Sequence, residues 1–167
     1  MIEYCGKIRN ITTITNLCNK TNIHNGISQT KNYITFLKFI VDNKILLIAD
    51  RNIKLNISWD QLNEQDLVFG KIIEIKNIKY LCRILTNKEW DELIIPHVPL
   101  DKDSHWNHTY SWCQDIYYRG KFISTSSYYV LRGFINVSYY AGAKASEDII
   151  PFGASPSHGW RPVLEII

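Results

Sequence analysis

The residues most able to bind a metal ion gather between positions 97 and 108. This segment contains three histidines and two aspartates, namely His97, Asp101, Asp103, His105 and His108. Imidazole and carboxylate groups bind transition metals, and the two aspartates can also bind calcium. The spacing matches no zinc motif and Lys102 adds an unfavourable positive charge, so we expect a solvated loop without a metal. A metal-dependent enzyme that uses this loop is kept as an alternative function.

Groups able to act as nucleophiles are present, but none stands in a catalytic motif. Neither Cys113 nor the serines at 124, 126 and 127 belong to a G-x-S-x-G turn. The glycines are too widely spaced for a phosphate-binding loop. Cys5, Cys18, Cys82 and Cys113 form no C-x-x-C pair, so we expect four free thiols. The sequence therefore predicts no catalytic residues, no cofactor and no enzymatic activity.

Residues 134–147 are instead typical of a binding surface. The segment is rich in Tyr, Ser, Asn, Gly and Ala, a mixture in which rigid aromatic rings supply contact area and small residues adapt the fit. The predicted ligand contacts are Asn136, Ser138, Tyr139, Tyr140 and Lys144, with Trp106 as a neighbour. The alternative interpretation is that Phe134, Tyr139 and Tyr140 simply pack in the core.

The composition is that of one globular domain. The chain has 167 residues, of which 46% are hydrophobic and 21% are charged. Its formal net charge is +3 and its basic residues are scattered singly, so nucleic acid is a disfavoured partner. The N-terminus shows no export signal, and no apolar stretch reaches the length of a membrane span. We therefore predict a cytoplasmic protein with no membrane partner, with incorporation into a virion as a further option.

Two hairpins are predicted ahead of these candidate sites. Residues 34–41 and 45–49 are β-branched and aromatic, and they flank a turn at Asp42-Asn43-Lys44. Residues 71–75 and 79–84 flank a second polar turn. Residues 1–33 show no firm period and predict an irregular or short-stranded segment.

Short helices are predicted where the spacing of a capping box occurs. Ser58 and Gln61 form one such pair, and Thr86 and Glu89 form another. The second pair begins a helix whose Trp90 lies on an apolar face, and prolines at 96 and 99 should end it. Loops over 97–127 and strands over 128–132 and 160–167 complete the prediction. Short strands, two or three short helices and long aromatic loops indicate an α+β domain.

Three C-terminal segments, taken in order, resemble formylglycine-generating-enzyme-like domains. They are Tyr80–Trp90, Tyr129–Gly133 and Gly159–Leu164. The resemblance implies a C-type-lectin-like fold over residues 71–167, with residues 1–70 as an N-terminal β-rich extension. It also implies structural roles for Trp90, Arg132, Gly133, Gly159, Trp160 and Arg161. The same fold occurs in phage tropism determinants, and residues 56–60 resemble a stretch of clostridial and phage-associated proteins.

The chemistry of that family does not carry over. Its enzymes bind copper through a cysteine pair that precedes the closing strand, and residues 134–158 of this chain contain no cysteine. The related iron enzymes use histidines of an added helical domain, which this chain does not contain. The sequence therefore predicts a non-catalytic recognition module of a phage or prophage that binds a protein or a glycan through residues 134–147. A small intracellular inhibitor of a host defence or nuclease system is the first alternative.

Overall fold

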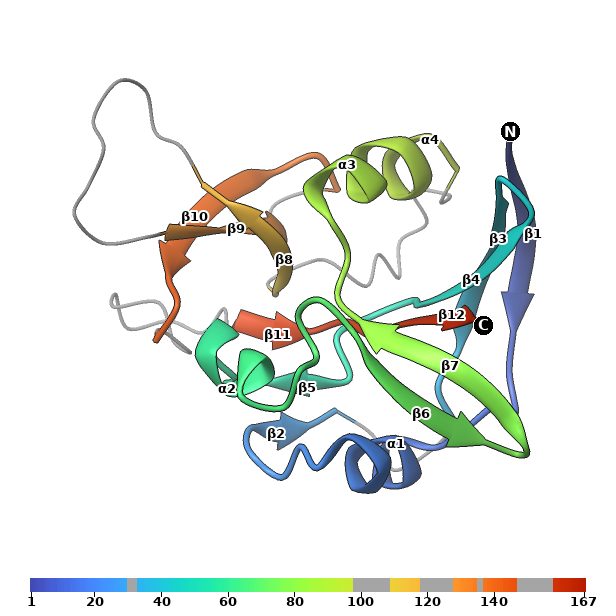
Figure 1. Ribbon diagram of the computed structural model, residues 1–167. Helices are drawn as coiled ribbons and strands as arrows, with labels where there is room; N and C mark the ends of the chain where they lie inside the picture. The colour runs from blue at the N-terminus through green and yellow to red at the C-terminus, as the bar shows by residue number, and fades with distance from the viewer. Residues whose placement is uncertain (30–32, 98–108, 118–127, 135–136, 147–157) are drawn as a thin grey trace.

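Twelve strands and a few short helices make up the part of the chain that the computed structural model describes, residues 1–29, 33–97, 109–117, 128–134, 137–146 and 158–167 (Figure 1). The strands form two six-stranded sheets, and the longest α-helix in these ranges has 8 residues. The predicted α+β class is therefore wrong, because strands dominate and the helices only cap or cover them.

The first sheet is antiparallel throughout and has the order β1-β3-β4-β12-β7-β6 (Figure 1). Its strands are β1 (Ile2–Ile8), β3 (Phe36–Val41), β4 (Lys44–Ala49), β6 (Lys71–Ile75), β7 (Ile78–Arg83) and β12 (Val163–Ile166). The strand β12 lies between β4 and β7 and pairs with both. Strands from both sides of residue 70 therefore share one set of ladder hydrogen bonds.

The second sheet has the order β10-β9-β8-β11-β5-β2. Its strands are β2 (Ile27–Ser28), β5 (Lys54–Leu55), β8 (Tyr110–Ile116), β9 (Tyr128–Gly133), β10 (Tyr140–Lys144) and β11 (His158–Trp160). Only the β8–β11 pair is parallel among these. The strand β10 occupies one edge of this order, next to β9 (Figure 1).

Both predicted hairpins of the first sheet are confirmed. The β3–β4 turn places Asp42 and Asn43 at φ values of 48° and 67°, and the β6–β7 turn places Lys76 and Asn77 at 52° and 62°. Two consecutive left-handed residues define the type I′ turn, whose twist matches that of the flanking strands. Asparagine tolerates this conformation better than most residues, which explains its place in each turn.

Both predicted capping boxes are present. Ser58 caps α2 (Trp59–Asn63), and Thr86 caps a continuous helical segment of α3 (Asn87–Glu89), η1 (Trp90–Ile94) and α4 (Ile95–His97). This segment continues past Pro96, contrary to prediction. Because η1 is a π-helical turn, the Ile95 amide donates to the Trp90 carbonyl five residues earlier, and the widened turn carries the chain through Pro96.

The helix α1 (Ile14–Thr21) lies within residues 1–33, for which the sequence predicts an irregular or short-stranded segment. The Thr13 hydroxyl accepts the Asn16 amide and caps its first turn. Ile14, Leu17 and Cys18 recur at the spacing of one helical face, and all three are buried. A short amphipathic helix therefore covers this end of the core.

The first sheet is buried on both faces, because alternate residues of its central strands enter two different apolar clusters. Phe36 and Leu47 belong to the cluster that extends to the second sheet, whereas Leu37 and Ile48 belong to the cluster beneath η1. Trp90 lies in this second cluster and is fully buried.

Truncation of Trp90 should therefore destabilise the protein. Its ring is 0% exposed and its Nε1 donates to the Val137 carbonyl at 2.7 Å. We expect Trp90→Ala to lower the free energy of unfolding by about 3–5 kcal/mol, measured by urea denaturation. Trp90→Phe keeps most of the ring and should lose less. An unchanged midpoint for Trp90→Ala would contradict this packing.

Glu165 on β12 is held by two cations. Its carboxylate accepts from Lys44 Nζ at 2.7 Å and lies 3.4 Å from Arg83 Nη2. Burial raises the pKa of this carboxyl, but Lys44 and Arg83 outweigh burial and lower it overall. A lowered pKa means that the ion pair stabilises the fold at neutral pH, and that this contribution is lost as pH falls through the folded-state pKa.

We therefore expect Glu165→Gln to destabilise the protein at pH 7 and to match the parent more closely near pH 3, below the usual glutamate pKa of about 4.3. Urea denaturation of both proteins at the two pH values measures the difference. A gap that is equal at both would show that the charge of Glu165 contributes nothing.

Candidate recognition surface on β9 and β10

The register of β9 and β10 decides which of the predicted contacts share a face. Tyr140 pairs with Arg132, and Lys144 pairs with Tyr128. Directly opposed residues of an antiparallel pair point to the same side, and side chains alternate along each strand. Tyr140, Lys144 and Arg132 therefore lie on one face of the sheet, with Gly142 between the first two.

Arg132 is the fixed point of this face. Its side chain is only 5% exposed, its Nη1 donates to Asn87 Oδ1 at 2.7 Å, and its Nη2 lies 2.8 Å from Asp91 Oδ1. Asn87 is also held in place, because its backbone amide donates to a carboxylate oxygen of Asp115. Charge-assisted bonds of this kind fix the planar guanidinium in one orientation. The helix that begins at Asn87 is thus tied to β8 and β9.

Two aromatic rings, those of Trp90 and Tyr140, contact this guanidinium. Its central carbon is 5.9 Å from the Trp90 ring centroid and 5.6 Å from that of Tyr140. Both distances are within the range of cation–π attraction. Tyr140 is 42% exposed, so one part of its ring packs on Arg132 and another part faces solvent. Burial and the neighbouring Tyr117 raise the pKa of the Tyr140 phenol, which stays neutral at physiological pH.

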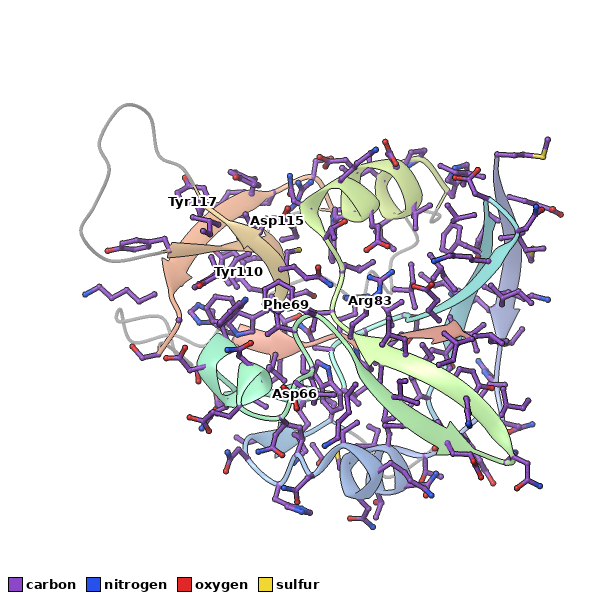
Figure 2. The ribbon with its side chains drawn as sticks, viewed as in Figure 1. Asp66, Phe69, Arg83, Tyr110, Asp115 and Tyr117 are labelled. Atoms are coloured by element: carbon purple, nitrogen blue, oxygen red, sulfur yellow. The ribbon has the colours of Figure 1, made fainter. Side chains whose placement is uncertain are left out.

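Tyr117 joins the surface from the end of β8. Figure 2 shows Tyr110 near the beginning of that strand and Tyr117 just past its end. The centroids of the Tyr117 and Tyr140 rings are 5.0 Å apart. A Cβ atom at Gly142 would come within 2.3 Å of the Tyr117 ring, so the missing side chain is what allows the ring to lie against β10.

Tyr139 does not share this surface. Its ring lies 6.0 Å from Tyr110 and 6.4 Å from Phe134 and packs at the margin of the core. Burial and the neighbouring Tyr139 together raise the pKa of the Tyr110 phenol. Of the two open interpretations, core packing describes Tyr139 and Phe134, whereas exposure describes Tyr140.

The structure describes two of the four other predicted contacts. Ser138 and Lys144 are exposed, whereas Asn136 and Trp106 lie outside the described residues. Sequence reasoning did not assign a binding role to Tyr117, Asn87 or Asp91. The sequence holds one indication of the Tyr117 contact. A glycine inside a strand, here Gly142, often marks the close approach of another group.

The predicted structural residues are all in the described ranges. Trp160 and Arg161 are fully buried, and Gly133 has a φ of +94°, a value that side chains disfavour. Gly159 lies so close to Asn52 that a Cβ atom would meet the Asn52 Cγ at 2.4 Å.

Of the five metal candidates, the structure describes only His97. His97 ends α4, where its ring packs edge-on against Phe39 at 6.1 Å, and the candidates at 101, 103, 105 and 108 lie outside the described residues. Among the residues that the structure does describe, no three His, Cys, Asp or Glu side chains gather around a common point.

The cysteines are free thiols, as predicted. Cys5 is exposed and the other three are buried. Burial raises the pKa of the Cys82 thiol to about 12 and raises that of Cys113 strongly as well. A buried thiol with a raised pKa holds little of the reactive thiolate at neutral pH, so Cys113 is poorly suited to nucleophilic chemistry.

Comparisons with protein-family models, curated proteins and solved structures found no match to this chain. The resemblance to formylglycine-generating-enzyme-like domains therefore stays a prediction. No helix within the described ranges has the length and apolar character needed to cross a bilayer.

The contact between Gly142 and Tyr117 gives a test of this surface. Gly142→Ala should cost about 1–3 kcal/mol in unfolding free energy, because the added methyl group displaces the Tyr117 ring. In a Tyr117→Ala background the same substitution should cost little. A double-mutant cycle by urea denaturation measures this coupling, and equal costs in both backgrounds would show that the ring does not lie on Gly142.

Proposed function

We propose that this protein is a non-enzymatic recognition module that binds a protein partner through the face of β9 and β10 carrying Tyr117, Tyr140 and Lys144. The observation that carries the proposal is the exposed ring of Tyr140, supported beneath by the buried Arg132 guanidinium. The raised pKa of Cys113 supports a module without covalent catalysis.

The physical basis is preorganisation. Tyrosine contributes a large contact area and loses only two torsional freedoms on binding. Much of this conformational entropy is already lost in the unbound protein, because Arg132 and Tyr117 confine the Tyr140 ring. Lys144 adds an exposed positive charge four residues along the strand, which favours an approaching acidic surface. Such a site favours a protein with an acidic rim around an apolar centre.

The biological setting is the one predicted from the sequence, a phage or prophage protein. Recovery of the protein in purified virions would assign the partner to the host surface. Binding to a host protein inside the cell would instead support the inhibitor alternative. Both outcomes use the same face, so the surface is tested separately from its setting.

Tyr140→Ala should weaken binding at least about tenfold, the effect of a modest hot spot, while leaving the fold intact. Immobilised parent and variant are exposed to the same host lysate, and the retained proteins are quantified and then titrated individually. Ile72→Ala on β6 is the matched control, since Ile72 is 63% exposed and lies in the other sheet.

A partner that Tyr140→Ala and the parent retain equally would contradict the proposed surface, provided that both proteins unfold at the same urea concentration. Tyr139→Ala is unsuitable for this test, because its contacts with Tyr110 and Phe134 would couple binding to stability.

A further inference from the structure

A second concave site lies away from the β9–β10 face, where α1 approaches the turn between β6 and β7 (Figure 1). The cavity measures about 440 Å³ and is bounded by the first turns of α1, by Tyr33 and by residues 74–77. This volume lies within the range of about 300–1,000 Å³ found for small-molecule sites. The proposed recognition function makes no use of it.

The wall of this cavity is built on rigid elements. Tyr33 is positioned by a bridge to Thr13 and by the Ile34 amide, which donates to the Thr12 carbonyl at 3.1 Å. The opposite wall is the type I′ turn, where Lys76 Nζ donates to the Asn10 carbonyl at 2.6 Å. The two walls are therefore held in place by hydrogen bonds that do not involve a ligand.

The polar groups of the cavity include both donors and acceptors. Its polar lining includes Asn16, Lys20, Glu74, Lys76 and Asn77. The Asn16 Nδ2 donates to Thr12 Oγ1 at 2.8 Å, and the same side-chain amide carries a second N–H donor and an acceptor, Oδ1. A ligand here meets ammonium donors, a carboxylate acceptor and amides that do both.

The aromatic wall adds a flat apolar face. Tyr33 is 53% exposed, although large aromatic side chains normally bury most of their surface. Because the ring borders a polar cavity, a ligand that fits both surfaces must carry an apolar face and a rim of hydrogen-bonding groups. A pyranose ring has this form, with C–H bonds on its faces and hydroxyl groups around its edge.

Charge distinguishes a sugar from an anion. The two lysines would favour a phosphate, but Glu74 lies on the same wall and repels one. Hydroxyl groups donate to a carboxylate and accept from an ammonium group, so a neutral sugar uses all of these side chains. We propose that this cavity binds one sugar unit of a glycan, as a second site independent of the β9–β10 face.

Saturation-transfer NMR tests the proposal with four probes: glucose, galactose, mannose and N-acetylglucosamine. At least one sugar should receive saturation from the intact protein. Its Kd, measured by titration, should rise about tenfold in Tyr33→Ala and in Glu74→Gln, and it should be unchanged in Tyr140→Ala. Tyr33 and Glu74 are exposed, so both variants should keep the urea midpoint of the parent.

Three results would overturn the proposal. One is the absence of saturation transfer to any of the four sugars. Another is binding that neither Tyr33→Ala nor Glu74→Gln weakens, or that Tyr140→Ala abolishes, since the sugar would then lie elsewhere. The third is displacement of the sugar by inorganic phosphate at equal concentration, which would assign the cavity to anions. None of these outcomes bears on binding of a protein to the β9–β10 face.

Discussion

The two sheets are joined around one buried cation, Arg161. Its Nε donates to Ser111 Oγ at 3.0 Å in the second sheet, and its Nη1 donates to the Ala49 carbonyl at 3.1 Å at the end of the first. Its guanidinium also lies 5.3 Å from the Trp90 ring centroid. Burial lowers the pKa of Arg161 to about 10, so the group is still charged at neutral pH. A buried charge is tolerated only where such partners surround it, which fixes the relative placement of sheets and helix.

The candidate surface depends on the same arrangement. Ser111, which accepts from Arg161, pairs with Arg132 across β8 and β9, so the Ser111 and Arg132 side chains lie on one face of the sheet. The Trp90 ring contacts both arginines, because its centroid lies 5.3 Å from the Arg161 guanidinium and 5.9 Å from that of Arg132. The exposed ring of Tyr140 is therefore the outer member of a stack that begins at the centre of the molecule. Rigidity at the surface follows from packing beneath it rather than from the strand alone.

Local chemistry was sufficient to predict the hairpins and the capping boxes, but it left open whether Tyr139 and Tyr140 pack in the core. It failed where long-range pairing decides the outcome. β2, β5 and β11 have two or three residues each, too few to show an alternating pattern, and this is why the β content was underestimated. Tyr139 and Tyr140 are adjacent and chemically alike, and only the register of β10 assigns them to opposite faces. The position of Tyr117 depends on a contact with Gly142, which lies 25 residues further along the sequence.

The strand order has a consequence for synthesis on the ribosome. Residues 158–166 form β11 and β12, which complete the second and first sheets in turn. They pair with β8, β5, β4 and β7, all of which are made earlier. Neither sheet can be completed until this segment has left the exit tunnel. Until then, the strands that pair with β11 and β12 have unpaired edges. Such edges are the usual starting points of aggregation. We therefore expect the nascent chain to bind a chaperone that covers the edges of β4 and β7 until β12 has been synthesised.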